Sequence, residues 1–308
     1  MPGNKNRMLI VGVSGMLGCN LAYYFRHAYS VLGLYHMHPV VIDGVRTEKA
    51  DILSERNFKK IVDDFDPNII IHCAALTNVD HCEIDHGLAD RLNVFATRIL
   101  VSSVRDDRSK LVYISSDSVY DGVKGNFSEN DPVNPKNYYG LSKYKGELES
   151  SKIRNSLVLR TNFFGWNIQK KQSIAEWVVH ELLKGNEIQG FRDVFFSSIY
   201  TFDLAVILNS AINRDLTGVF NCGSNTPISK YDFAVRIAKL FNLERSLIKA
   251  ISIDDYNLKA KRGKNLTLNV DKIGEATGCI APSIGESTQS FYGDYVKGLP
   301  EKIRYGNI

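Results

Sequence analysis

The feature that most constrains the fold is a short apolar run that leads directly into a glycine-rich turn. The run, MLIVGV from Met8 to Val13, is too brief for a helix and contains glycine near its end. This pattern is typical of a strand that is buried on both faces. From Gly18 onward, apolar residues recur at helical spacing. The chain is therefore predicted to begin with a strand, a tight turn and a helix.

The same alternation continues through the first half of the chain. Further strands are predicted over 31–36, 68–75 and 110–115, and a helix over 87–104. Such an order is typical of a parallel sheet with helices on both faces and right-handed crossovers. We therefore expect an α/β protein with a Rossmann-like, doubly wound parallel sheet, whose ligands bind beyond the carboxyl ends of the strands.

After Arg160 the alternation weakens, and the stretch over 193–200 reads as a strand among helices. A smaller, mixed α/β substrate-binding domain is expected there. We predict a Rossmann domain over 1–165, rejoined by part of 195–225, and a mainly substrate-binding domain over 166–308. A cleft between two such units is a common place for a substrate.

Composition and charge give no support for a nucleic-acid, membrane or metal partner. The charge sum of 38 − 34 = +4 over 308 residues is small, so it does not favour a nucleic-acid or membrane partner. No apolar run approaches the roughly 18 residues that span a bilayer. Five scattered cysteines without a CxxC pair favour the reducing cytoplasm. We predict no metal site, because His72 and His81 near Asp80 and Glu83 lack ligand spacing.

Gly12, Gly15 and Gly18 stand in GVSGMLG, between the first predicted strand and helix. Glycines in this place make a tight turn, let a pyrophosphate approach the backbone, and let helix and strand pack closely. A glycine-rich turn without a ligand is the alternative. The position directly after a strand favours a dinucleotide site, and the GxxGxxG spacing indicates one branch of dinucleotide-binding proteins.

Tyr139 and Lys143 are four residues apart in YYGLSKYKGE, so a helix places both on one face. An ammonium beside a phenol stabilises the phenolate, and we expect it to lower the pKa of Tyr139 from about 10 toward neutrality. Ser116, after the strand that ends near Ile114, can hydrogen-bond a carbonyl oxygen held between it and Tyr139. The alternatives are that Tyr139 and Lys143 are a pair on the protein surface and that Ser116 belongs to a polar turn. The order of glycine turn, hydroxyl and Tyr/Lys pair favours one shared active site.

On these motifs the chain resembles the extended short-chain dehydrogenase/reductase superfamily and, within it, the dTDP-4-dehydrorhamnose reductase family. The similarity runs through KADIL, CAALTNVDHCE, LNVFAT, LVLRTNFFG and KRGKNLTLNVDKIGEATG. It implies Ser116, Tyr139 and Lys143 as catalytic residues. Predicted cofactor contacts are Gly12, Ser14, Gly15, Met16, Leu17, Gly18, His36, Asp51, Ile52, Ala74, Ala75, Asn93, Tyr139 and Lys143. Predicted substrate contacts are Thr77, Val79, Ser116, Asp117, Asn162, Phe163 and Arg262.

The chain departs from the family pattern at several of these positions. Ser116 stands where threonine is usual and keeps the hydroxyl, Phe163 replaces the usual tryptophan, and Gly263 follows Arg262 where the family has proline. Sugar-nucleotide 4,6-dehydratases are also similar to this chain, but they carry Thr-Asp-Glu, and the position of their glutamate is Ser118 here. Because the carboxylate that would act as base is absent, elimination of water is not expected.

Residues after the second predicted strand bear on the choice of cofactor. NAD-preferring proteins place an acidic residue there, against the ribose 2′-hydroxyl, whereas this chain has Tyr35-His36-Met37-His38. No carboxylate would repel a 2′-phosphate, and His36, His38 or Arg46 could pair with one. A polar loop that touches no ligand is the alternative. We expect NADP(H) to be mildly preferred over NAD(H).

The expected function is NAD(P)H-dependent reduction of a keto group on a nucleotide-activated deoxysugar, in deoxysugar or polysaccharide precursor biosynthesis. Tyr139 would protonate the alkoxide, Ser116 would orient the carbonyl, and Lys143 would hold the nicotinamide ribose. Arg262 could bind the nucleotide diphosphate, although a solvated basic face is the alternative. Two other functions stay open, a nucleotide-sugar epimerase and a non-catalytic NADP-binding subunit, because the beta subunit of methionine adenosyltransferase resembles the same family. The predicted assembly is a homodimer.

Overall fold

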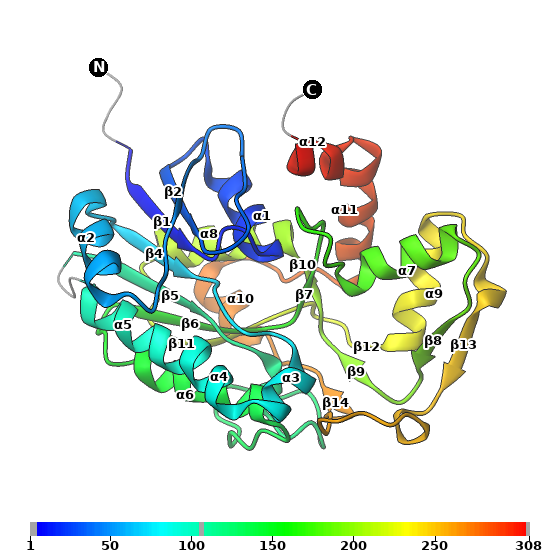
Figure 1. Ribbon diagram of the computed structural model, residues 1–308. Helices are drawn as coiled ribbons and strands as arrows, with labels where there is room; N and C mark the ends of the chain where they lie inside the picture. Colours follow the sequence, from blue (N-terminus) through cyan, green and yellow to red (C-terminus); the bar gives the residue numbers. More distant parts are fainter. Residues whose placement is uncertain (1–4, 105–107, 306–308) are drawn as a thin grey trace.

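The computed structural model describes residues 5–104 and 108–305 (Figure 1). Its central element is a seven-stranded sheet in the order β11-β6-β5-β4-β1-β2-β3, and every neighbouring pair of strands in it is parallel. The predicted Rossmann-like α/β fold is confirmed. The strands are β1 (Arg7–Val11), β2 (Ser30–Tyr35), β3 (Arg46–Lys49), β4 (Ile69–His72), β5 (Lys110–Ile114), β6 (Ser156–Thr161) and β11 (Gly218–Cys222).

Each face of the sheet carries its own apolar core. Alternate side chains of a strand point to opposite faces, so Met8 and Ile10 of β1 join one core and Leu9 and Val11 the other. Helices α1 and α8 cover the first core, and α2 and α5 cover the second, with α6 packed beside α5. These helices are α1 (Met16–Phe25), α2 (Glu55–Phe65), α5 (Ala96–Ser103), α6 (Tyr138–Ser150) and α8 (Thr201–Asn213).

The strand order places the ligand site. From β1 the chain moves to β2 and β3 on one side, and then returns to β4, β5 and β6 on the other side. In an open parallel sheet, ligands bind beyond the carboxyl ends of the strands at the point of this reversal. The segments after β1 and β4 are therefore the ones on which a ligand should rest.

The stretch predicted as one helix over 87–104 is instead divided. It comprises α4 (His86–Asp90), the π-helical segment η1 (Arg91–Phe95) and α5, and is preceded by α3 (Val79–Ile84). A π-helical turn inserts a residue into the helical ladder and is frequent at functional sites. Apolar periodicity alone does not reveal such a turn, which explains why the prediction missed it.

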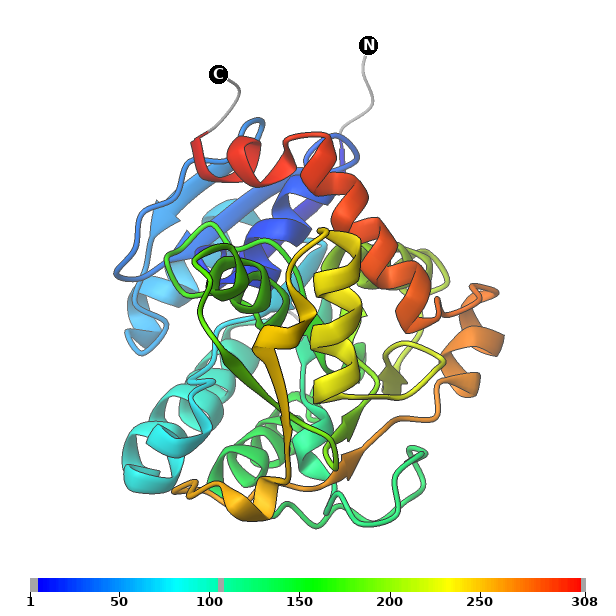
Figure 2. The ribbon, with the colours of Figure 1, turned by 90° about the vertical axis from the view of Figure 1, so that its right-hand side faces the viewer.

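The second half of the chain builds three small sheets around further helices. The stretch predicted as one strand over 193–200 forms two short strands in different sheets, β9 and β10. In Figure 2, β8, β13 and α9 face the viewer, and the red helices α11 and α12 run toward the N-terminal strands. The strands are β7 (Phe163–Phe164), β8 (Ile188–Phe191), β9 (Phe195–Phe196), β10 (Ile199–Tyr200), β12 (Ile228–Ser229), β13 (Ile248–Ile251) and β14 (Asn265–Leu266). The helices are α7 (Ile174–Leu183), α9 (Lys230–Leu240), α10 (Asp271–Thr277), α11 (Ile284–Val296) and α12 (Leu299–Tyr305), with short 3-10 segments η2 (Asp117–Val119), η3 (Arg245–Leu247) and η4 (Ile253–Asp255).

Part of the second half returns to the central sheet. Strand β11 pairs with β6 at the edge of that sheet, and α8 packs against α1. The division of the chain at residue 165 into two domains stays a prediction. Within the described residues, no helix is long and apolar enough to cross a membrane.

Candidate active site

A cleft with a volume of about 660 Å³ opens beyond the carboxyl ends of β1, β2, β4 and β5. Its size is that of a site for a small organic ligand. The predicted cofactor residues that line it are Gly12, Ser14, Gly15, Met16, Leu17, Gly18, His36, Ile52, Ala74, Ala75 and Tyr139. The predicted substrate residues that line it are Thr77, Val79, Ser116, Asp117, Asn162 and Phe163.

The glycine turn at the start of α1 is shaped by close backbone contacts. Gly12 has φ 90°, and a Cβ there would lie 2.7 Å from the Ala74 nitrogen. A Cβ on Gly18 would lie 2.3 Å from the Gly12 carbonyl oxygen, so glycine is required at both positions. Gly15 is different, because its nearest such neighbour is 3.4 Å away. Gly15 is also the N-cap of α1 and no side chain caps it, which leaves free N–H groups for an anion at the cleft.

Helix α6 carries the predicted Tyr/Lys pair. Its N-cap is Asn137, whose Oδ1 accepts a hydrogen bond from the Gly140 nitrogen at 3.0 Å. Tyr139 lines the cleft, whereas Lys143 is buried below it, with Nζ 4.2 Å from the centroid of the Tyr113 ring. The helix therefore brings Tyr139 to the cleft and Lys143 beneath it.

Burial governs the ionisation of this pair. It raises the pKa of Tyr139 well above its usual value, although a hydrogen bond with Ser116 acts in the opposite direction. The expectation of a Tyr139 pKa near neutrality is wrong for the protein alone, because loss of hydration outweighs the stabilisation of a phenolate. Burial also lowers the pKa of Lys143 to about 8, although the Glu147 carboxylate acts to raise it.

Ser116 and Asp117 form a compact hydrogen-bonded group at the end of β5. Ser116 Oγ donates to Asp117 Oδ1 at 3.0 Å and accepts from the Ser118 nitrogen at 3.1 Å. The Asp117 carboxyl group also accepts from Asn162 Nδ2 at 2.9 Å and from Ser118 Oγ at 3.2 Å. Burial raises the pKa of Asp117, while these hydrogen bonds and the charge of Lys230 lower it. Ser118 thus supports Asp117 and supplies no second carboxylate.

Asn93 lies in the π-helical segment and does not line the cleft. Its Oδ1 accepts from the Leu76 nitrogen at 2.7 Å, and its Nδ2 donates to the Leu76 oxygen at 3.1 Å. Nδ2 also donates to Ser142 Oγ at 2.8 Å. Asn93 therefore ties the loop after β4 to helix α6.

Three other predicted residues lie outside the cleft. Asp51 borders a neighbouring hollow beside β3 and α2. Arg46 is exposed and pairs with Glu48 at 2.9 Å, so only His36 and His38 of the expected 2′-phosphate partners line the cleft. Arg262 pairs with Asp80 at 3.1 Å.

The segment that follows Arg262 makes a close contact with another loop. A Cβ on Gly263 would lie 2.7 Å from the Gly122 Cα, so glycine at this position lets the two loops touch. Arg262 itself keeps one buried nitrogen, Nη1, without a hydrogen-bond partner among the described residues. The segment is held near the start of helix α6, because Asn137 Nδ2 donates to the Lys261 oxygen at 2.9 Å.

Sequence reasoning missed the wall contributed by residues 167–173, which we call the strap. Asn167, Gln169, Lys171, Gln172 and Ser173 of the strap line the cleft. The capping box formed by Ser173 and Glu176 at the start of α7 is visible in the sequence as S-x-x-E, and it could have indicated that this segment is fixed. The direction of the strap depends on distant residues and has no local signal.

The buried ion pair behind the predicted catalytic residues was missed as well. Arg160 Nη2 lies 2.7 Å from Glu147 Oε2, and the two side chains are 5% and 4% exposed. Glu147 also accepts a hydrogen bond from Ser115 Oγ, the residue directly before Ser116. The pair therefore connects α6 to the ends of β5 and β6.

This arrangement has the elements of a carbonyl reductase site. A carbonyl oxygen between Ser116 Oγ and Tyr139 Oη would meet two hydroxyl groups, and Ser116 would donate to it by turning its O–H away from Asp117 Oδ1. The open N-terminus of α1 suits the pyrophosphate of a dinucleotide. The apolar side chains of Leu34, Ile52 and Phe58 that line the cleft can cover an adenine ring. The residues present therefore fit a nicotinamide dinucleotide.

Several known proteins are similar to this chain in sequence and in architecture. A dTDP-4-dehydrorhamnose reductase of Aggregatibacter actinomycetemcomitans is 30% identical over 293 residues, which cover 90% of this chain and 95% of that protein. Methionine adenosyltransferase 2 subunit beta of Rattus norvegicus is 28% identical, over 87% of this chain and 82% of that protein. The crystal structure of a dTDP-4-dehydrorhamnose reductase from Bacillus anthracis in complex with NADP has a TM-score of 0.84 and 26% identity, covering 94% of this chain and 99% of that one. The sequence also matches the RmlD substrate binding domain over residues 6–296, and the protein therefore belongs to that family.

Proposed function

We propose that the protein is an NAD(P)H-dependent reductase of a keto group on a nucleotide-activated deoxysugar, in deoxysugar or polysaccharide precursor biosynthesis. The observation that carries this proposal is that Ser116 and Tyr139 both line the cleft that begins at the uncapped end of α1. The names and full-length similarity of the relatives support the same class of reaction.

The chain's own residues act on the carbonyl oxygen. Bound NAD(P)H supplies the hydride to the carbonyl carbon. Ser116 Oγ holds the oxygen by a hydrogen bond, and Tyr139 Oη gives it a proton as negative charge develops. The raised pKa of Tyr139 suits this direction, because the phenol keeps its proton until a stronger base, the alkoxide, is present. A positive charge on Lys143 then stabilises the phenolate that remains.

The proposed cofactor is NADP(H), mildly preferred over NAD(H). His36 and His38 line the cleft beyond β2, and no acidic residue occupies positions 35 to 38. The relative from Bacillus anthracis was crystallised with NADP. The two dissociation constants, for NADPH and for NADH, test this preference directly. A protein that binds NADH much more tightly would contradict it.

The nucleotide sugar is proposed to reach the catalytic residues from the side of α3 and the 260–264 segment. There, Thr77 and Val79 line the cleft, and the guanidinium group of Arg262, which pairs with Asp80 outside the cleft, is proposed to turn toward the diphosphate. A homodimer is proposed on the basis of exposed apolar side chains on adjoining helices, since Phe95 is 46% and Leu148 52% exposed. Absence of a nucleic-acid partner and a cytoplasmic location stay predictions.

A regulatory subunit is the second candidate, because a methionine adenosyltransferase subunit is among the relatives. A scaffold would bind NADPH without consuming it, and an epimerase would return its cofactor unchanged. The discriminating experiment incubates the protein and NADPH with a panel of 4-keto-6-deoxy nucleotide sugars. We expect stoichiometric loss of NADPH absorbance and formation of the alcohol. Tight NADPH binding without turnover of any member of the panel would favour the scaffold.

A further inference from the structure

The strap, residues 167–173, crosses from β7 to α7 and forms one wall of the cleft. Its tip approaches the opposite wall, where Lys171 Nζ donates a hydrogen bond to Thr77 Oγ1 at 2.9 Å. Thr77 follows β4, on the other side of the cleft. This bond therefore spans the entrance between the two walls.

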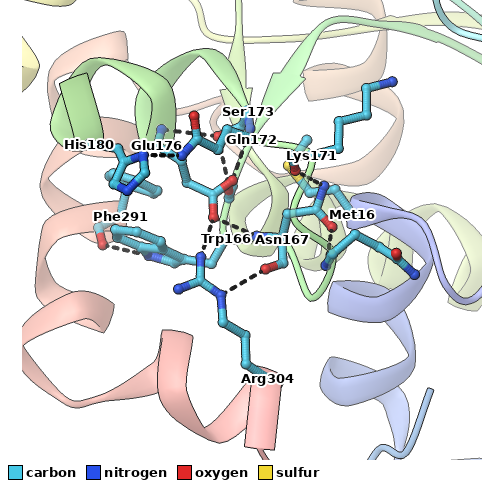
Figure 3. Close-up of polar contacts among 12 residues, drawn as sticks. Met16, Trp166, Asn167, Lys171, Gln172, Ser173, Glu176, His180, Phe291 and Arg304 are labelled. Carbon is cyan, nitrogen blue, oxygen red and sulfur yellow. Dashed lines mark hydrogen bonds and ion pairs between the residues drawn. The ribbon is translucent and has the colours of Figure 1, made fainter. Parts of the chain in front are cut away.

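The base of the strap is held by a buried carboxylate (Figure 3). Glu176 Oε1 accepts hydrogen bonds from the Asn167 nitrogen at 2.9 Å and from Arg304 Nη2 at 2.9 Å, and Oε2 accepts from the Ser173 nitrogen at 2.9 Å. Arg304 Nε also donates to the Asn167 oxygen at 3.2 Å. Both ends of the strap are thus fixed to the same side chain.

The backbone carbonyl group of Lys171 is held by Asn167, a residue at the base of the strap. Asn167 Nδ2, which is buried, donates to the Lys171 oxygen, and Asn167 Oδ1 accepts from the Gln169 nitrogen at 3.0 Å. The backbone that carries Lys171 is therefore fixed, while its exposed side chain is free to change partner. A fixed backbone with a mobile ammonium is suited to capture a ligand at the cleft entrance.

Charge makes Lys171 distinctive. Among the described residues that line the cleft, it is the only lysine or arginine, and none of the ion pairs recorded within 5–104 and 108–305 includes it. Its hydrogen-bond partner, Thr77, is a neutral hydroxyl group. An ammonium has three donors and binds anionic oxygen more strongly than neutral oxygen. The ligands of the proposed reaction all carry phosphate.

We propose that Lys171 is a phosphate-binding residue, and that its ammonium leaves Thr77 for the diphosphate of a nucleotide bound in the cleft. The proposal rests on the proposed function for the identity of the ligands. Two sources share this chemistry: the pyrophosphate of the dinucleotide, at the N-terminus of α1, and the diphosphate of the nucleotide sugar.

Binding titrations of the full chain test the proposal without requiring turnover. NADPH and dTDP are titrated separately into the wild type, Lys171→Met, Lys171→Arg and the control Lys170→Met, whose exposed lysine is the neighbour of Lys171 and does not line the cleft. We expect Lys171→Met to weaken one probe about tenfold, as loss of a charge-assisted hydrogen bond would do. Lys171→Arg should stay within about threefold of the wild type, and the tenfold difference should shrink in high salt.

The two probes separate the sources of phosphate. Weaker NADPH binding assigns Lys171 to the cofactor, and weaker dTDP binding assigns it to the substrate nucleotide. The proposal would be overturned if the wild type and Lys171→Met bound NADPH with the same affinity and also bound dTDP with the same affinity. It would also be overturned if Lys170→Met lost as much affinity as Lys171→Met, or if the wild type bound neither probe. A wild type that binds the probes but reduces no keto sugar would contradict the proposed function and leave the phosphate site standing.

Discussion

At the scale of single residues, burial sets the chemistry of the site. Tyr139→Phe keeps the ring but removes the hydroxyl group of a residue that lines the cleft together with Ser116. We expect turnover to fall by roughly 10²-fold or more, with NADPH affinity little changed, because the proton donor is lost and the cofactor contacts remain. Steady-state kinetics and an NADPH titration check this prediction. Near-normal turnover would show that another group delivers the proton.

The buried Lys143 predicts a dependence of stability on pH. Burial lowers its pKa to about 8 from the usual lysine value of 10.5, so between these two values the unfolded chain holds more protons than the folded protein. The contribution of Lys143 to the free energy of unfolding should therefore rise with pH across that interval and level off above it. Lys143→Met should lose this rise. Urea denaturation of both proteins from pH 7 to 10 measures how the free energy of unfolding changes with pH. If it changed in the same way in both proteins, Lys143 would not be the cause of the rise.

At the scale of elements, helix α6, which carries Tyr139 and Lys143, is fixed by the buried Glu147–Arg160 pair. Glu147→Gln leaves the Arg160 charge uncompensated, and we expect it to lower the free energy of unfolding by about 3–5 kcal/mol. Glu48→Gln breaks the exposed pair with Arg46 and should cost less than about 1 kcal/mol. Chemical denaturation of the two variants makes the comparison. Equal losses of the free energy of unfolding would show that the buried pair stabilises the protein no more than the exposed pair does.

Elements with a local pattern could be predicted from the sequence. Strands such as β4, with its run of isoleucines, and the turn at Gly12 carry their own signals. The π-helical segment around Asn93 could not be predicted in this way, because the same apolar spacing suits a continuous helix. The strap was missed for another reason, since its course depends on Arg304, which lies far along the chain. Tyr139 was identified from its spacing with Lys143, but burial, which no motif records, reversed the expected direction of its pKa.

At the scale of the whole molecule, the C-terminal helix α12 supports a wall of the cleft through Arg304. Arg304→Met should raise the KM of the nucleotide whose binding uses the strap by about tenfold with a smaller change in kcat, because the strap loses its anchor and the chemical groups remain. Arg304→Lys should restore part of the loss, and the exposed Lys302→Met serves as the control. An equal fall of kcat and stability without a change in KM would indicate a purely structural role.

In the proposed reaction, hydride passes from the cofactor to a keto carbon of a nucleotide sugar, and no elimination of water accompanies it. The most direct test supplies NADPH deuterated at the transferable position together with a 4-keto-6-deoxy nucleotide sugar. We predict an alcohol that carries one deuterium at the former keto carbon. With oxidised cofactor and an unmodified hexose nucleotide, no 4-keto-6-deoxy product should form, because Ser118 is too weak a base for elimination of water. A product without deuterium, or a 4-keto-6-deoxy sugar formed from the unmodified hexose, would contradict the account.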